Sequence, residues 1–400
     1  MVRKVAVVGI GTVPWQMRNA DKTWRALGFQ AVKRAFEHAK ISRKEVDNVV
    51  YSIYCETMIR QQIPSILIQD YLGFQGLPSL RIEAGAATEG YALSAAYAQI
   101  VSGMSDITLL VALQKGGDFF DFQTRSRGDG FQNGLAISMD TTWLTPVNAG
   151  VPAYLTIFCL VPHMEKYGSP TPEQLAKVSV KNYNNAYTNP EAQLHQKVTV
   201  DDILNSRIFA WPTTTRMCCL YSDGACAMIL ASEEKAKEIT DKPVWITGTA
   251  TSSYSLQRAE AGTIGRMIGT NIAAQRAYKM AGIKKPIDEL DLIQVQDLIT
   301  GTEILAYEEL GLCELGGGGR LVDEGVVERD GKVPANVDGG RIACGHVGGV
   351  SGAYGACEIV RQLREEAGDR QIQIKKGRGV MQCIEGHASL SSVTVFDRER

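Results

Sequence analysis

The stretch from Ala31 to Val50, "AVKRAFEHAKISRKEVDNVV", decides the fold because the chain contains a second copy of it. The second copy, "AAQRAYKMAGIKKPIDELDLI", begins at Ala273 and repeats Ala, Arg-Ala-aromatic, Ala and Ile at the same spacing. Glu-Val-Asp near the end of the first copy matches Glu-Leu-Asp of the second after a short insertion. The chain therefore contains an internal duplication.

Each copy lies between two apolar runs. The runs "VAVVGIGT" and "VDNVVYSIY" flank the first copy, and "VWITGTAT" and "LDLIQVQDLI" flank the second. We expect the run before each copy to end in a Gly-Thr turn. A strand, helix and strand that occur twice favour an α/β fold in which helices cover both faces of a sheet.

Composition restricts the class of protein. The chain has 400 residues, 44% of them hydrophobic and 22% charged, with a formal net charge of −2. These values indicate an ordinary globular chain long enough for two domains. They do not indicate binding to nucleic acid or to a membrane surface. The opening "MVRKVAVVGIGT" leads directly into a β-rich run, so we expect no signal peptide and a cytoplasmic location. The nine cysteines form no C-x-x-C pair, which argues against a disulfide framework.

The duplicated halves are separated by a long irregular segment. Turn-rich pieces such as "DFFDFQTRSRGDGFQNG" alternate with "TPEQLAKVSVKNYNNAY", whose Thr171 is a typical helix N-cap. We predict an N-terminal half formed by residues 1–118 and 222–240, a loop domain over 119–221, and a C-terminal half over 241–400. An insertion of this length is expected to cover a site or a partner surface.

Dinucleotide and metal sites are not supported by the motifs. Gly9 and Gly11 follow a strand as in a phosphate-binding fingerprint, but Pro14 replaces the third glycine. The five histidines show no metal-ligand spacing, so we predict no metal bound by this chain.

One turn resembles the lead-in to a catalytic nucleophile. "RIEAGAATEGYALSAAYAQIVSG", from Arg81 to Gly103, predicts a strand, a tight turn of small residues and a helix of alanines. Ala86 occupies the tip of the turn, where only a methyl group is available. A methyl group cannot attack a carbonyl carbon, so this position forms no acyl-enzyme.

Further candidate residues lie in the second half. His346 lies in a glycine-rich turn that leads into a small-residue helix, and this turn is predicted to face the Ala86 turn. Cys383 is predicted to lie in a tight turn between two strands, and Gln296 at the end of a strand. His346 alone suits a structural histidine, but together with Cys383 it indicates a catalytic site in solvent-reachable turns.

Long motifs in this order resemble the thiolase superfamily, in its sterol-carrier-protein-type branch. They include "AQIVSGMSDITLLVA", "MEKYGSPTPEQLA", "NNAYTNPEAQ", "CCLYSDGACAMILAS", "ILAYEELGLC" and "NVDGGRIACGH". The resemblance implies duplicated halves in a five-layered α-β-α-β-α core, a homodimer formed through the N-terminal halves, and a loop domain that covers a coenzyme A pocket.

The resemblance also implies roles for the candidate residues. In the family, a cysteine at the position of Ala86 accepts the acyl group, while the residues matched by His346 and Cys383 activate thiols and transfer protons. This chain departs from the family at Gln296, where asparagine or histidine is usual, and at Glu385, where glycine is usual. The amide of Gln296 is expected to face an oxyanion or a water molecule, and the role of Glu385 is open.

Two hypotheses follow. In the first, coenzyme A attacks a β-ketoacyl-CoA directly, with His346 and Cys383 moving protons and the Ala86 N–H donating to the oxyanion. In the second, the chain is a non-catalytic subunit that binds acyl-CoA or scaffolds a complex. Coenzyme A is a substrate in the first hypothesis, and no group is bound covalently in either.

The resemblance extends to thiolase-like subunits that work with a small partner carrying a zinc-binding segment and an oligonucleotide-binding-type barrel. It implies such a partner here, with any zinc held by the partner. The overall similarity is greatest to a subunit that splits benzoylsuccinyl-CoA in anaerobic toluene degradation, which makes benzoylsuccinyl-CoA a candidate substrate.

Overall fold

The computed structural model describes residues 3–119, 150–256 and 261–399. Most of the turn-rich piece "DFFDFQTRSRGDGFQNG" and part of the predicted loop domain therefore lie outside the described residues. The boundaries proposed for the two halves and the loop domain stay a prediction. Within the described ranges, no helix is both long enough and apolar enough to cross a membrane.

The N-terminal half contributes five strands to a nine-stranded sheet, in the order β3-β2-β4-β7-β1. Strands β2, β3 and β4 run parallel to one another, whereas β7 pairs antiparallel with β4 and β1. The strands are β1 (Val5–Thr12), β2 (Asn48–Ser52), β3 (Ser79–Ile82), β4 (Ile107–Gln114) and β7 (Gly224–Ser232). The helices are α1 (Trp24–Ala39), α2 (Glu56–Ile59), α3 (Pro64–Tyr71), α4 (Thr88–Val101) and α11 (Glu233–Ile239).

The C-terminal half repeats this order with one strand fewer, as β8-β11-β10-β9. Its strands are β8 (Val244–Ser253), β9 (Leu292–Gln294), β10 (Arg378–Ile384) and β11 (Leu390–Asp397). Its helices are α12 (Ile268–Ala281), α13 (Pro286–Glu289), α14 (Thr300–Glu309), α15 (Gly318–Asp323) and α16 (Ser351–Arg364). The counterpart of β3 is reduced to one parallel bridge between Ile293 and Ala335.

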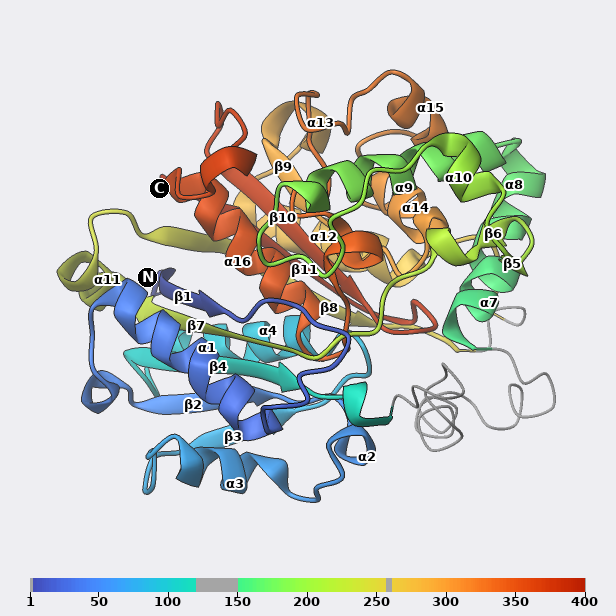
Figure 1. Ribbon diagram of the computed structural model, residues 1–400. Helices are drawn as coiled ribbons and strands as arrows, with labels where there is room; N and C mark the ends of the chain where they lie inside the picture. The colour runs from blue at the N-terminus through green and yellow to red at the C-terminus, as the bar shows by residue number, and fades with distance from the viewer. Residues whose placement is uncertain (1–2, 120–149, 257–260, 400) are drawn as a thin grey trace.

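The two halves form five layers, as Figure 1 shows with the N-terminal half below and the C-terminal half above. Helices α1 and α11 pack on the outer face of the N-terminal strands, and α12 packs on the outer face of β8, β10 and β11. Helices α4 and α16 contact strands of both halves and each other. The predicted α-β-α-β-α core is therefore confirmed, with α4 and α16 as its middle layer.

The repeated alanines mark the same helix–strand contact in both halves. A Cβ placed on Gly9 of β1 would lie 2.6 Å from Ala39 Cβ and 2.8 Å from the carbonyl oxygen of Ala35. A Cβ placed on Gly248 of β8 would lie 2.2 Å from the carbonyl oxygen of Ala277. Glycine is required at both positions because α1 and α12 lie so close to the sheet.

The predicted Gly-Thr turns are wrong for this reason. Strand β1 continues to Thr12, and β8 continues through Gly248 to Ser253. Gly248 occurs within β8, whereas Gly11 and Thr12 are the last residues of β1, and at both places glycine allows a helix to approach the strand.

The described part of the loop domain is mainly helical and packs on the C-terminal half. It contains α7 (Val151–Leu155), a π-helical turn (Thr156–Leu160), α8 (Val161–Tyr167), α9 (Pro172–Tyr187), α10 (Val200–Leu204), β5 (Ile208–Ala210) and β6 (Thr213–Thr214). Helix α9 begins as predicted, because Thr171 accepts a hydrogen bond from the Gln174 N–H at 3.2 Å. Helix α9 also packs against α14 and α15.

We predict that Gly248→Val destabilises the protein by about 2–3 kcal/mol, because the new side chain would overlap the backbone of α12. Ser253→Val, at the exposed end of the same strand, is the matched control and is expected to change stability by less than about 0.5 kcal/mol. Urea unfolding of the two variants provides the measurement. Equal stabilities would contradict the close contact between β8 and α12.

Candidate active site

The turns of Ala86 and His346 face each other in the structure, as the sequence predicts. Ala86 lies just before α4, and His346 lies just before α16. A Cβ placed on Gly348 would lie 3.2 Å from Ala86 Cα. The starts of the two middle-layer helices therefore meet at one place, and this place is the candidate active site.

The Ala86 turn is fixed by a side chain of the helix that follows it. Thr88 Oγ1 accepts a hydrogen bond from the Ala84 N–H at 2.8 Å and donates one to the Gly85 carbonyl at 2.5 Å. Gly85 has a φ of +59°, a left-handed conformation that glycine adopts without strain. Ala86 itself is only partly buried. The turn is thus ordered as it would be for a nucleophile, although its side chain is a methyl group.

Gln296 joins the Ala86 turn to the strand that carries Cys383. Its Nε2 donates to the Ala86 carbonyl at 2.8 Å, and its Oε1 accepts from the Ile384 N–H at 2.8 Å. Gln296 lies two residues beyond the end of β9 and is 2% exposed. Its amide therefore holds the two halves together at the site, in addition to any role toward a bound oxyanion.

The hydrogen bonds of Ser351 determine which nitrogen of His346 is available. Ser351 Oγ lies 3.0 Å from the Val347 carbonyl and donates its proton there, so it accepts from His346 Nδ1–H at 2.8 Å. His346 Nε2 is then left with its lone pair. Burial and the nearby Arg341 lower the pKa of His346 to about 3. His346 is therefore neutral at physiological pH, with an unprotonated Nε2, and is a weak base in the substrate-free chain.

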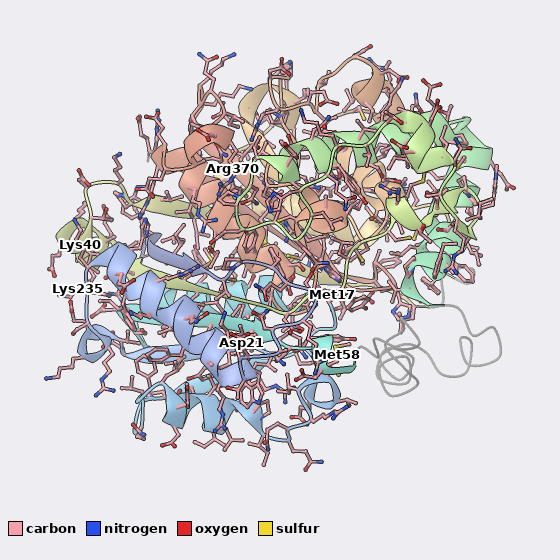
Figure 2. All side chains as sticks on the ribbon, in the orientation of Figure 1. Met17, Asp21, Lys40, Met58, Lys235 and Arg370 are labelled. Atoms are coloured by element: carbon pink, nitrogen blue, oxygen red, sulfur yellow. The ribbon has the colours of Figure 1, made fainter. Side chains whose placement is uncertain are left out.

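Aromatic and apolar side chains lie beside His346. The ring of Tyr221 meets the His346 ring nearly edge-on, with centroids 5.8 Å apart. Tyr221 packs with Tyr54, Cys55 and Met58 in a small cluster separate from the main cores, and Figure 2 labels Met58 on α2. This cluster gives the candidate site one apolar wall.

Cys383 does not lie in an exposed turn, and that prediction is wrong. It belongs to β10, points into the middle layer and is fully buried. A Cβ placed on Gly352 of α16 would lie 1.9 Å from Cys383 Sγ, and one placed on Gly90 of α4 would lie 3.4 Å from it. The thiol fits between two central helices because each has a glycine there. Solvent also barely reaches His346, which is 3% exposed.

Glu385 closes the turn between β10 and β11. Its carboxylate accepts hydrogen bonds from the N–H groups of His387 and Ser389, both at 2.6 Å, and from His387 Nδ1 at 2.8 Å. Burial opposes ionisation of this carboxyl group, but the bonds from His387 and Ser389 outweigh it and lower the pKa of Glu385. The backbone N–H of Glu385 donates to the Leu390 carbonyl. Both groups are therefore engaged in hydrogen bonds within this turn and its strands.

Glu89, which the sequence analysis missed, is a buried carboxyl group in the first turn of α4. It is fully buried and accepts hydrogen bonds from the N–H groups of Gly349 and Gly352, at 2.9 and 2.6 Å. Burial raises the pKa of Glu89 to about 7, despite these two bonds. An isolated carboxyl group among the small residues of "AGAATEGYALSAA" was the available signal.

Asp297 and Arg341 support the site from behind. Asp297 follows Gln296 and accepts from the backbone N–H of Arg341 at 2.6 Å. The Arg341 guanidinium is buried, pairs with Asp338, and donates to the Ser351 carbonyl at 3.2 Å. These contacts connect the backbone around Gln296 to the start of α16. The described residues contain no group of three or more His, Cys, Asp or Glu side chains that could hold a metal ion.

Comparison with known proteins agrees with this geometry. Residues 248–398 match a family model described as thiolase C-terminal domain-like. The chain is 34% identical to an acetyl-CoA acetyltransferase of Methanothermobacter thermautotrophicus, over 99% of this chain and all of that protein. The chain belongs to the thiolase superfamily.

Two further relatives of this thiolase-superfamily chain are informative. It is 27% identical to benzoylsuccinyl-CoA thiolase subunit BbsB of Thauera aromatica, over 93% of this chain and 92% of that subunit. The solved structure of the Ltp2-ChsH2(DUF35) aldolase shares the fold, with a TM-score of 0.83 and 22% identity over 99% of this chain and 98% of that chain.

Glu89 gives a testable pH dependence of stability. An unfolded glutamate has an ordinary pKa of 4.5, and the folded value is about 7, so the folded chain holds the proton more tightly. The stability that this provides is fully present below about pH 4.5 and is lost as the pH rises to about 7, by roughly 3 kcal/mol.

We predict that Glu89→Gln removes this loss. The measurement is urea unfolding of both proteins from about pH 4.5 to 8, with wild type compared with the variant at each pH so that other titrating groups cancel. The stability of wild type relative to the variant should fall across this range. A difference that does not vary with pH would show that Glu89 titrates normally.

Proposed function

We propose that this chain cleaves a β-ketoacyl-CoA with coenzyme A by direct attack of the coenzyme A thiol, without an acyl-enzyme at position 86. The observation that carries the proposal is the combination of a methyl group at Ala86 with a neutral His346 in the facing turn. The named activities of its relatives, acetyl-CoA acetyltransferase and benzoylsuccinyl-CoA thiolase, support acyl transfer of the thiolase type.

The proposed reaction has two proton transfers. His346 Nε2 takes the proton of the coenzyme A thiol, and the sulfur attacks the β-keto carbon, whose oxygen is stabilised by the Ala86 N–H. The bond between the keto carbon and the α-carbon then breaks, and its electron pair forms an enolate. Cys383 donates its proton to the α-carbon and is reprotonated from His346 or solvent.

The assignment of Cys383 as the acid has a structural requirement. Its thiol is buried between Gly90 and Gly352 in the substrate-free chain. Substrate binding must therefore open a path to the thiol, because the thiol itself fills the space that the glycines leave between α4 and α16. Burial first, and the Glu89 carboxylate second, raise the pKa of Cys383 well above its ordinary value, so the thiol retains a proton to donate.

Benzoylsuccinyl-CoA is the specific substrate that we propose to test first. It is supported by the similarity to BbsB and by the apolar wall of Tyr54, Met58 and Tyr221, which suits an aromatic acyl group. The methyl group of Ala86 also occupies less space than the usual cysteine side chain.

A second candidate reaction is retro-aldol cleavage of a β-hydroxyacyl-CoA. It needs a base and an acid but no nucleophile, and Ala86 with a neutral His346 meets that requirement. The name of the Ltp2-ChsH2(DUF35) aldolase supports it as an activity within this fold. Incubation with a β-hydroxyacyl-CoA, without free coenzyme A, separates the two reactions. Absence of turnover with either substrate would favour a non-catalytic, acyl-CoA-binding subunit.

We further propose that the chain forms a homodimer through its N-terminal half and binds a small zinc-containing partner. The outermost strand of that half, β3, has an exposed Leu80 and an unpaired edge within the described sheet. BbsB is named as a subunit, and the name Ltp2-ChsH2(DUF35) joins two components. Metal analysis of this chain purified alone tests whether any zinc belongs to the partner.

We predict ternary-complex kinetics with β-ketoacyl-CoA and free coenzyme A, because the attacking sulfur belongs to the substrate. Initial rates with both substrates varied should give intersecting reciprocal plots, and intact-protein mass spectrometry during turnover should show no acyl adduct. Parallel plots, or an adduct on any cysteine, would mean that another residue serves as the nucleophile. Ala86→Cys is expected to give no increase in rate, since the new sulfur would occupy space used by the reacting groups.

We predict that His346→Ala and Cys383→Ser each reduce turnover by roughly 10²–10⁴-fold. Cys357→Ala is the control, because Cys357 is also fully buried on α16 but has no role in the proposed transfers. Thermal unfolding of all three variants separates lost chemistry from lost stability. If the two site variants keep near-full activity, the proposed site is wrong.

A further inference from the structure

Glu89 accepts hydrogen bonds at the start of α16 and also lies close to Ala86, His346 and Cys383 in the candidate site. It lies one residue before Gly90, which faces Cys383, and one helical turn beyond Ala86. Its two carboxylate oxygens accept from Gly349 and Gly352, which follow His346 in the chain. One side chain of the N-terminal half thus holds the backbone that carries His346.

The same carboxylate lies beside the thiol of Cys383. A Cβ placed on Gly352 would lie 1.9 Å from Cys383 Sγ, 2.8 Å from Glu89 Cγ and 3.2 Å from Glu89 Oε1. The sulfur of Cys383 and the carboxylate of Glu89 therefore both lie next to the position that a Cβ of Gly352 would occupy. Both residues are fully buried, so water does not screen their interaction.

The charges around this pair favour the protonated thiol. A thiolate beside a carboxylate would place two negative charges together in a buried layer, which is unfavourable. The guanidinium of Arg341 lowers the pKa of both Glu89 and Cys383. Cys226 on β7 is also near Glu89, but its pKa is raised well above the ordinary value, so it stays a neutral thiol. The negative charge of Glu89 raises the pKa of Cys383, and Glu89 is ionised at the alkaline pH where thiols lose their protons.

We propose that Glu89 is a positioning residue that fixes the His346 turn against α4 and keeps the Cys383 thiol protonated. Cys383 then serves as an acid and does not replace the nucleophile that is absent at Ala86. The role of Cys383 as an acid rests on the proposed function. The protonation state of its thiol does not, and it can be measured without any substrate.

The experiment is an alkaline titration of the Cys383 thiolate, followed by its ultraviolet absorbance. The full-length chain is compared with Glu89→Gln and Glu89→Asp, and each protein is paired with the same protein carrying Cys383→Ser, so that the difference isolates this thiol. We expect Cys383 in wild type and in Glu89→Asp to ionise well above the ordinary range of a cysteine thiol. In Glu89→Gln, its midpoint should fall by at least about one pH unit.

Glu89→Asp separates charge from position. The shorter side chain keeps the negative charge but cannot reach both Gly349 and Gly352, so we expect turnover to fall about tenfold or more while the thiol stays protonated. If Glu89→Gln does not fold, Glu89→Ser replaces it, because serine removes the charge and leaves room for water. The midpoint of the Cys383 titration should fall in this variant as well.

Three results would overturn the inference: equal thiol midpoints in wild type and the uncharged variant, ionisation of Cys383 in wild type within the ordinary range of a cysteine thiol, or unchanged turnover in Glu89→Asp. Failure of the proposed function gives a different pattern, in which no β-ketoacyl-CoA is cleaved but the thiol midpoint still depends on Glu89.

Discussion

Two helices buried between two layers of strands must find partners inside the protein for the N–H groups at their N-termini. Water cannot reach the start of α16, and the carboxylate of Glu89 on α4 accepts its Gly349 and Gly352 N–H groups instead. The two helices of the middle layer are therefore joined by polar bonds at the same ends where Ala86 and His346 lie. The packing of the two halves and the geometry of the site depend on this junction.

The junction explains why a chain without the usual nucleophile keeps an ordered nucleophile turn. Thr88 fixes the turn from within α4, and Gln296 fixes it from the other half of the molecule. Because each contact uses backbone groups of the turn, replacing the side chain at position 86 by a methyl group leaves the turn intact. The site can therefore lack the cysteine side chain at position 86 and still keep the geometry of its turn.

The sequence predicts the fold well because the duplication records contacts that the fold needs in each half, such as Gly9 with Ala35 and Gly248 with Ala277. It also predicts that the turns of Ala86 and His346 face each other. It does not predict the depth of Cys383, because alternation along a strand does not reveal which face is covered by glycine-bearing helices. The partners of Glu89 and most of those of Glu385 were missed because they are backbone N–H groups, which no residue type encodes.

The two halves differ at their outer edges. The outermost position of the C-terminal half is occupied by the single bridge of Ala335 to β9, whose residues are all buried, whereas β3 ends the N-terminal half with Leu80 exposed. A duplicated chain with two open edges would offer a joining surface at each end and could grow into a filament. With one edge covered, any strand pairing between copies would be limited to two chains, so the imperfect repeat removes the second joining surface that a filament needs.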